Sequence, residues 1–423
     1  MIYREAGQFK TSYGADQAIF PIRQDRIFIA LFMALVLIAV PALAGEYLLS
    51  SVILPFLVLS IAAMGLNILL GYCGQISLGM AAFMAVGAFA AYKLITGMPW
   101  LPVIPVFILA GIVTALVGML FGLPSLRIKG FYLAVTTLAA HFFIEWALTH
   151  FGWFSNYSTS GVISAPGMTL RTFPPVLAVG LGAAVLGAAA GLIGRADLRG
   201  WGVAVAIGAL AVHVLLDFAL SIAAYLGWMA PAGLPAALAL ELPIRSPAAK
   251  YFFALGFVLV LALAMKNIAR SALGRAFMAV RDRDVAAEVM GIPMLKTKLL
   301  AFAISSFYCG VAGALWVFAY IGTVEPQAFD LNRAFQILFM VIIGGLGTVL
   351  GSFLGVGFVL VLPIAITNIA SAFGAVMPAE VLSNMELIVF GALIIFFLIV
   401  EPAGLARLWQ IAKEKLRLWP FPY

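Results

Sequence analysis

Apolar runs of about 20 residues recur between Ile27 and Val400, and they constrain the fold more strongly than any other feature. The hydrocarbon core of a bilayer is about 30 Å thick, so each spanning helix needs about 20 apolar residues. Hydrophobic residues make up 65% of the chain, above the roughly 45–50% of soluble domains. The short alternating segments of a membrane β-barrel do not occur. The sequence therefore predicts an all-α integral membrane protein, a polytopic helical bundle.

Turn signals between the apolar runs divide them into twelve predicted spans. These spans cover residues 27–44, 50–70, 76–95, 102–122, 131–150, 175–194, 201–227, 250–267, 298–320, 334–347, 352–370 and 385–400. We interpret residues 172–246 as an inserted two-span hairpin, because this Ala- and Gly-rich pair is bounded by Pro-rich linkers and leaves later orientations unchanged. Ten core spans remain, in halves at 27–171 and 247–401, an arrangement compatible with an inverted repeat.

The Lys and Arg residues favour a topology with both chain ends, 1–26 and 402–423, in the cytoplasm. The loops that this topology places inside are mostly basic, whereas the opposite loops contain few basic residues. The net charge of +7 is thus accounted for by membrane orientation and does not indicate nucleic-acid binding. Lys93 is the main exception, and its long side chain can reach the interface.

A charged segment, "VRDRDVAAEVMGIP" at 280–293, lies in the largest predicted cytoplasmic loop, 266–298. Helical spacing predicts one face made of Asp284, Ala287, Glu288 and Gly291, beside an apolar stripe made of Val285, Val289 and Ile292. Pro293 ends the helix. The spacing fits a helix offered to a soluble partner, and it fits equally well a basic loop whose apolar stripe rests on the membrane.

Polar residues accompany the glycine-rich segments in and beside the predicted spans. They are Gln75 and Ser77, next to Gly74 in "GYCGQISLG", and Thr136 and Thr137 in a later span. This composition permits a broken helix whose free N–H groups face a carboxylate along a solute pathway. Close packing of helices through small residues is the alternative interpretation.

Two His–acid pairs at i, i+4 spacing also fall within predicted spans, His141 with Glu145 and His213 with Asp217. Ionisable groups inside a membrane are costly and are often functional. These pairs support a second hypothesis, an ion- or proton-coupled secondary transporter. A third hypothesis is a membrane subunit that assembles a complex but transports no solute.

Motifs for enzymatic chemistry do not occur in the sequence. It contains no Gly-Lys-Ser/Thr and therefore no phosphate-binding P-loop. It contains no metal-ligand spacing and no nucleophile cluster, so we expect neither a metal nor a cofactor in this chain. Cys73 and Cys309 fall in or beside apolar segments and are expected to pack in the core.

Several segments together resemble one family of transporters. The stretch 271–315, which contains "AAEVMG", resembles the EAA-type cytoplasmic loop of ABC-importer permeases, with Asp284-Val285-Ala286-Ala287 departing from its first positions. Segments 67–92 and 339–363 resemble glycine-rich regions of the LivH and LivM permeases, and 123–139 is more like LivM. The chain thus resembles the permease subunits of branched-chain amino acid type ABC importers, and the insertion is outside the pattern.

This resemblance implies a multi-pass subunit of the bacterial inner membrane that imports branched-chain amino acids, or related solutes such as urea, amides or aromatic acids. It implies as partners a LivH-like permease, two cytoplasmic ATPases of the LivG/LivF type that use ATP and Mg²⁺, and a periplasmic binding protein. The residues it implies for ATPase coupling are Arg281, Asp284, Ala287, Glu288 and Gly291. Those it suggests for contact with the binding protein are Asn156, Ser160, Glu325, Gln327 and Asp330.

Overall fold

The structure is a computed structural model, and its described part is mostly helical. It describes residues 31–98, 101–125, 131–158, 161–172, 240–372, 388–389, 391–393, 395–397, 399 and 404–418. The chain forms two compact units. The first comprises Met1–Leu49, Met98–Pro105 and Gly167–Ala248, and the second comprises Ser50–Gly97, Val106–Pro166 and Ala249–Tyr423.

The first unit contains η1 (Leu35–Ala39), α3 (Val40–Leu43) and a two-stranded antiparallel sheet. In this sheet β2 (Thr169–Thr172) pairs with β3 (Leu240–Pro243), and Thr172 lies opposite Leu240. The two ends of the predicted insertion are therefore hydrogen-bonded neighbours. The two predicted spans of the insertion, with His213 and Asp217, lie outside the described residues.

The remaining elements belong wholly or mainly to the second unit. In chain order they are η2 (Leu48–Ile53), α4 (Leu54–Asn67), η3 (Ile68–Tyr72), α5 (Met80–Gly97), α6 (Val103–Ser125), α7 (Phe131–His150), β1 (Ile163–Ser164), α10 (Pro247–Arg270), α11 (Ala272–Asp282), α12 (Asp284–Val289), α13 (Met294–Leu315), η4 (Trp316–Ile321), β4 (Thr323–Val324), η5 (Pro326–Phe329), α14 (Leu331–Gly344), α15 (Val349–Ala372) and α17 (Gly404–Leu418). Strands β1 and β4 pair antiparallel, so two short sheets are added to the predicted all-α fold.

Within the described ranges, seven helices are long and apolar enough to cross a membrane. They are Leu48–Tyr72, Met80–Gly97, Val103–Leu123, Tyr132–His150, Pro247–Arg270, Met294–Ile321 and Val349–Asn368. Each coincides with a predicted span, and the predicted span 27–44 coincides with the shorter apolar helix Leu31–Leu43. Of the predicted span 385–400, residues 388–389, 391–393, 395–397 and 399 are described, and they are helical.

The predicted span 334–347 corresponds to α14, which is only 14 residues long. At 1.5 Å per residue such a helix extends about 21 Å, which is shorter than a hydrocarbon core of about 30 Å. A glycine turn ends it: Gly345 and Gly347 both adopt positive φ, of 116° and 74°. The apolar run therefore continues into α15 through a turn.

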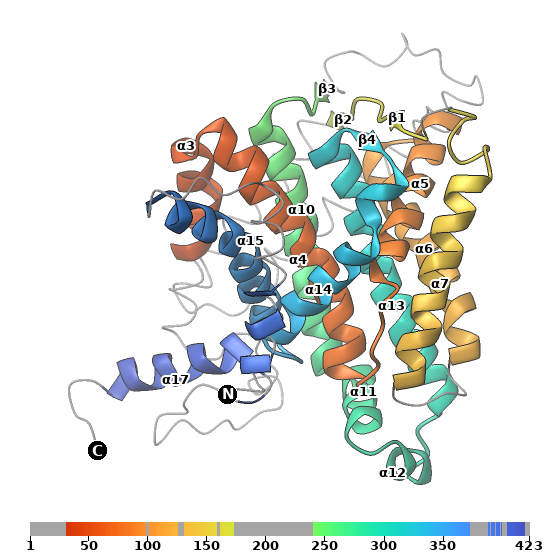
Figure 1. Cartoon of the computed structure of the whole chain (residues 1–423), viewed down its shortest axis with the longest axis vertical. Helices are drawn as coiled ribbons and strands as arrows, with labels where there is room; N and C mark the ends of the chain where they lie inside the picture. The colour runs from red at the N-terminus through yellow and green to blue at the C-terminus, as the bar shows by residue number, and fades with distance from the viewer. Residues whose placement is uncertain are drawn as a thin grey trace, which may run out of the picture. The chain divides into compact units, whose positions relative to one another are not determined.

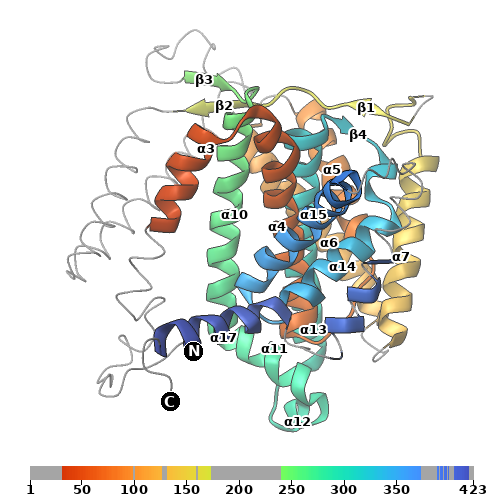
Figure 2. The same cartoon turned by 60° about the vertical axis from the view of Figure 1, so that its left-hand side comes forward.

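The core of the second unit lies around α4 and α13. The most apolar windows of Leu48–Tyr72 and Met294–Ile321 are each 83% buried, against 28% for Pro247–Arg270 and Val349–Asn368. Glycine allows α5 to pack directly against α13, because a Cβ on Gly87 would collide with the backbone of Gly310. Figures 1 and 2 show α12 at one end of this bundle and the β1–β4 pair at the opposite end.

Candidate functional site

The predicted amphipathic helix forms part of a helical loop between α10 and α13 (Figure 1). The hydroxyl of Ser271 caps the start of α11 by accepting a hydrogen bond from the backbone N–H of Gly274, at 3.3 Å. Arg283 is extended (φ −154°, ψ 98°) and separates α11 from α12. Beyond α12, Gly291 adopts a φ of 85° and Pro293 precedes α13. The predicted helix thus exists, and it is a single short element of six residues.

The exposed face of α12 differs from the face that helical spacing predicts. Ala287 is fully buried where α12 packs against α11 and α13, whereas Glu288 and Gly291 are exposed. The apolar neighbours point outward, with exposed fractions of 64% for Val285 and 85% for Val289. Spacing identifies residues that share a face, but only packing decides which face turns inward.

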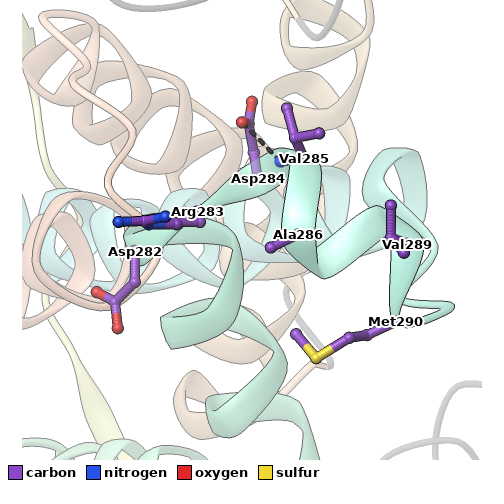
Figure 3. A pocket seen from close by; sticks show the side chains of 7 residues that line it. All are labelled: Asp282, Arg283, Asp284, Val285, Ala286, Val289 and Met290. Atoms are coloured by element: carbon purple, nitrogen blue, oxygen red, sulfur yellow. Dashed lines mark hydrogen bonds between the residues drawn. The ribbon is translucent and has the colours of Figure 1, made fainter.

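A surface pocket lies over this exposed face of α12 (Figure 3). Its lining residues are Asp282, Arg283, Asp284, Val285, Ala286, Val289 and Met290. The Asp284 carboxylate accepts a hydrogen bond from the backbone N–H of Val285 at 2.8 Å, in the first turn of the helix. The face therefore combines apolar side chains with charges of both signs at its edge.

Arg281 connects this loop to the end of a spanning helix. Its Nη1 donates a hydrogen bond to the carbonyl oxygen of Gly71 at 2.8 Å, and its Nε donates to Asp282 Oδ1 at 2.9 Å. Gly71 lies in η3, so the guanidinium satisfies a carbonyl at a helix C-terminus. Arg281 thus points into the chain, toward the glycine-rich break.

Asn67, which the sequence analysis did not single out, links the same break to the α14–α15 turn. Its amide nitrogen donates to the Thr348 carbonyl at 2.8 Å and to Ser352 Oγ at 2.9 Å. Its amide oxygen accepts from the Gly347 N–H at 2.7 Å. A lone Asn in an apolar span is the sequence signal for such a residue, because a buried amide needs partners.

Between η3 and α5 the chain is non-helical from Cys73 to Gly79, and Gly74 has a φ of 70°. The helix is broken as the glycines permit, and several N–H groups there have partners within the chain. Those of Gly74, Gln75 and Leu78 donate to Leu70 O, Leu69 O and Thr137 Oγ1, each at 3.0 Å. These three N–H groups are therefore not free to face a solute.

The polar side chains in this region differ in burial and in hydrogen bonding. Thr137 is buried and accepts from Leu78, whereas Thr136 is half-buried and donates to the Leu133 carbonyl. Ser77 is buried, and its hydroxyl accepts from the Gly79 N–H at 3.3 Å. The Gln75 side chain is buried, and its Oε1 has no hydrogen-bond partner among the described residues.

The two cysteines are free and buried. Cys73 lies just outside a spanning helix, and burial raises the pKa of its thiol to about 12, against the weaker opposing effect of Lys298. The thiol is therefore protonated at neutral pH, in agreement with the predicted packing role.

At the opposite end, the β1–β4 pair brings together the two segments that contain the predicted contacts for a binding protein. Asn156 is already engaged, because its amide nitrogen donates to Tyr92 Oη at 2.8 Å and its oxygen accepts from Lys93. The remaining three differ in exposure and role. Gln327 is exposed, Glu325 is half-buried, and Asp330 caps α14 by accepting from the Arg333 N–H at 2.9 Å. Ser160 lies outside the described residues.

The pair His141 and Glu145 lies on α7, with Nε2 and Oε2 separated by 3.8 Å. This is longer than a hydrogen bond, and neither ring nitrogen of His141 has a hydrogen-bond partner in the described structure. The side chain of His141 is fully buried, whereas that of Glu145 is 40% exposed. The second predicted pair lies outside the described residues.

A bundle of apolar helices with a charged helical loop at one end and glycine-rich breaks between spans indicates a multi-pass membrane protein. Comparison with known families agrees. A sequence model described as the permease component of the branched-chain amino acid transport system matches residues 48–398. The chain belongs to this family of ABC-transporter permeases, and it is a transport subunit and not an enzyme.

Curated relatives are consistent with this assignment. The high-affinity branched-chain amino acid permease LivM of Salmonella typhimurium is 26% identical over 292 residues, which is 68% of this chain and 56% of LivM. LivM of Escherichia coli gives the same values. The autoinducer 2 import permease LsrC of Klebsiella pneumoniae is 36% identical over 108 residues, 24% of this chain and 31% of LsrC. The match thus spans little more than half the length of LivM. No solved structure matches.

Proposed function

We propose that this chain is the transmembrane permease subunit of an ATP-driven importer for branched-chain amino acids or related small polar solutes. Its family supports transport, and the relatives named LivM support the solute class. In the proposed assembly a second, LivH-like permease completes the pathway, two cytoplasmic ATPases use ATP and Mg²⁺, and a periplasmic binding protein delivers the solute. The comparisons do not favour a proton-coupled secondary transporter.

The observation that carries the proposal is the exposed apolar face of α12 at the end of the bundle. Val285, Val289 and Met290 are 64%, 85% and 70% exposed, on a loop at one end of the bundle (Figures 1 and 3). Apolar side chains surrounded by charges are typical of a surface that a protein partner covers. We place the ATPase contact on these residues and Glu288, with Ala287 supporting them from below.

Movement of the ATPases would reach the spans through Arg281. A displacement of α12 moves the end of α11, and Arg281 transmits it to the Gly71 carbonyl at the end of η3. Asn67 then links that helix end to the α14–α15 turn through Gly347 and Thr348. Two glycine-rich breaks are thereby connected to one cytoplasmic element, which suits a rocking motion of the spans.

The full topology forms part of the proposal. We infer ten core spans, a two-span insertion at 172–246, and both ends of the chain in the cytoplasm of a bacterial inner membrane. The basic loop 266–298 supports this orientation. The pairing of β2 with β3 supports the insertion, because it brings its two ends together.

Replacement of Val289 by Asp tests the docking face. The variant should insert normally and lose the ATPases on co-purification, because a charge placed in the centre of an apolar contact is desolvated without a partner. Uptake of L-leucine by cells that express all subunits should fall at least about tenfold.

Val162→Asp, at the opposite end of the molecule, is the matched control and should retain the ATPases. Normal ATPase association and uptake in Val289→Asp would rule out this face as the docking site. Uptake by the chain alone, driven by a proton gradient, would overturn the proposed function itself.

A further inference from the structure

Trp316 and Arg333 form a pair that the coupling function does not use, in which Trp316 is buried and Arg333 is half-buried. Trp316 begins η4, the π-helical continuation of α13, and is 3% exposed. Arg333 lies in the first turn of α14, and its guanidinium carbon is 4.6 Å from the centroid of the Trp316 ring. The Tyr320 ring, one turn further along, contacts the Trp316 ring at a tilt of 53°, with a centroid distance of 4.6 Å. π-helical turns are frequent at functional sites in membrane and soluble proteins.

Both residues of this pair contain a buried N–H donor that lacks an acceptor. Trp316 Nε1 and Arg333 Nε have no hydrogen-bond partner within the described part of the chain. Arg333 Nη1 donates to Gln336 Oε1 at 2.6 Å, and no carboxylate among the described residues lies within ion-pair distance of the guanidinium. Buried donors without partners are rare and costly.

Stacking alone does not account for these groups. A cation over an indole ring interacts with the face of the ring, whereas the Nε1–H bond lies in the ring plane. The contact therefore satisfies the charge of Arg333 in part and leaves both N–H groups unused. What is missing is an acceptor, and beside a guanidinium the preferred acceptor is an anion.

A negatively charged residue, Asp330, also lies near Arg333. Asp330 interacts electrostatically with both Arg333 and His141, and η5, just before Asp330, packs against α7, the helix that contains His141. Both Asp330 oxygens already accept hydrogen bonds, one from the Arg333 backbone and one from Asn332. The surroundings thus contain both signs of charge, which suits a zwitterion better than a neutral solute such as urea or an amide.

We propose that Trp316 Nε1 and Arg333 Nε bind the carboxylate of the transported solute. This inference rests on the proposed function and narrows its solute class to carboxylate-bearing compounds. Arg333 supplies charge and one hydrogen bond, and Trp316 supplies a second hydrogen bond and a flat apolar wall.

The proposal is tested on the purified full chain in lipid nanodiscs, with thermal unfolding as the readout. Two probes of nearly equal shape are compared, 4-methylpentanoate and 4-methylpentanamide, which differ in the carboxylate. A ligand that binds only the folded chain raises its unfolding temperature, so the acid should stabilise and the amide should not. L-leucine and L-leucinamide repeat the comparison in the presence of the ammonium group.

Three variants identify the groups involved. Trp316→Phe keeps an aromatic ring but removes the N–H, Arg333→Lys keeps the charge but removes Nε, and Arg333→Gln removes both charge and Nε. Trp316→Phe and Arg333→Gln should each weaken acid binding about tenfold or more, since a hydrogen bond to a charged group is lost. Arg333→Lys should lie between wild type and Arg333→Gln.

The chain offers a matched control, because Lys93 lies over Trp153 with Nζ 4.5 Å from the ring centroid. Trp153→Phe should leave acid binding unchanged. A purely structural role for Trp316 would lower the unfolding temperature of the ligand-free chain and preserve the difference between acid and amide. That result, or equal stabilisation of the wild type by the two probes, would overturn the proposal.

This failure is distinguishable from failure of the proposed function. Val289→Asp removes the docking face and should retain acid binding in nanodiscs. Trp316→Phe should retain the ATPases on co-purification. Loss of uptake in Val289→Asp together with unchanged acid binding in Trp316→Phe would leave the importer assignment standing and remove only the carboxylate site.

Discussion

At the residue scale, two polar side chains organise the end of the spans that lies nearer α12. Asn67 is fully buried and holds the α14–α15 turn through three hydrogen bonds, and Arg281 holds the helix end at Gly71. Gly71 is required there, because a Cβ at this position would collide with Asn67 Oδ1 and the Gly347 nitrogen. Close approach of two backbones therefore explains this glycine better than flexibility does.

Arg281→Met should separate coupling from assembly. The methionine retains apolar length but cannot donate to Gly71, so ATPase hydrolysis should continue while solute uptake falls about tenfold, the loss expected for a charge-assisted hydrogen bond. The measurement is the ratio of solute imported to ATP hydrolysed in proteoliposomes. Arg275→Met, on the same helix and bonded only to the nearby Arg270 carbonyl, should leave this ratio unchanged. Equal ratios in the two variants would contradict the transmission role of Arg281.

At the element scale, the bundle is held together by helices that approach through small residues. A Cβ on Gly313 would collide with the Met84 carbonyl, and Tyr308 Oη donates to the Leu261 carbonyl at 2.8 Å, so α13 is fixed to both α5 and α10. In a membrane such contacts substitute for the hydrophobic effect, since lipid is as apolar as the side chains. The position of the glycines thus decides which helices are neighbours.

Gly87→Ala tests this packing. Its Cβ would overlap the Gly310 backbone, so α5 and α13 must separate, and we expect a loss of about 1 to 3 kcal/mol in the free energy of unfolding. Gly97→Ala, at the end of the same helix with nothing within 4 Å, should be neutral or slightly stabilising. Denaturation of the two variants in detergent gives the comparison, and similar stabilities would show that the helices are not in contact as described.

At the scale of the whole molecule, the second unit has α12, the proposed docking element, at one end and the β1–β4 pair at the other (Figures 1 and 2). The exposed apolar residues of α10 and α15, among them Val260 and Val361, suit lipid or a second permease. An importer needs two different ends, because solute enters at one end and the ATPases act at the other.

Cysteine labelling tests the proposed orientation. Cys73 and Cys309 are buried, so the wild-type chain should react slowly with maleimides. In intact cells an impermeant maleimide should label Gln327→Cys, and it should label Val289→Cys only after the membrane is permeabilised, because the two positions lie at opposite ends. The reverse pattern would show that the chain is inserted the other way round.

Sequence alone determined the helical membrane class, because an apolar run long enough to cross a bilayer has few other stable structures. It located seven spans, the break after η3 and a helix before Gly291 and Pro293, since these depend on local composition and on glycine and proline. The family resemblance likewise lay in contiguous segments, and the match over residues 48–398 confirmed it.

Only the tertiary structure decided which polar groups have hydrogen-bond partners and which side chains face outward. It turned Ala287 inward and Val289 outward, and it gave the N–H groups of Gly74, Gln75 and Leu78 to partners in the chain. Among the described residues it left Trp316 Nε1 and Arg333 Nε without a hydrogen-bond partner. Trp316 and Arg333 are 17 residues apart in the chain and come from different helices. Periodicity describes one helix at a time, whereas burial and hydrogen bonding depend on what other segments of the chain place beside it.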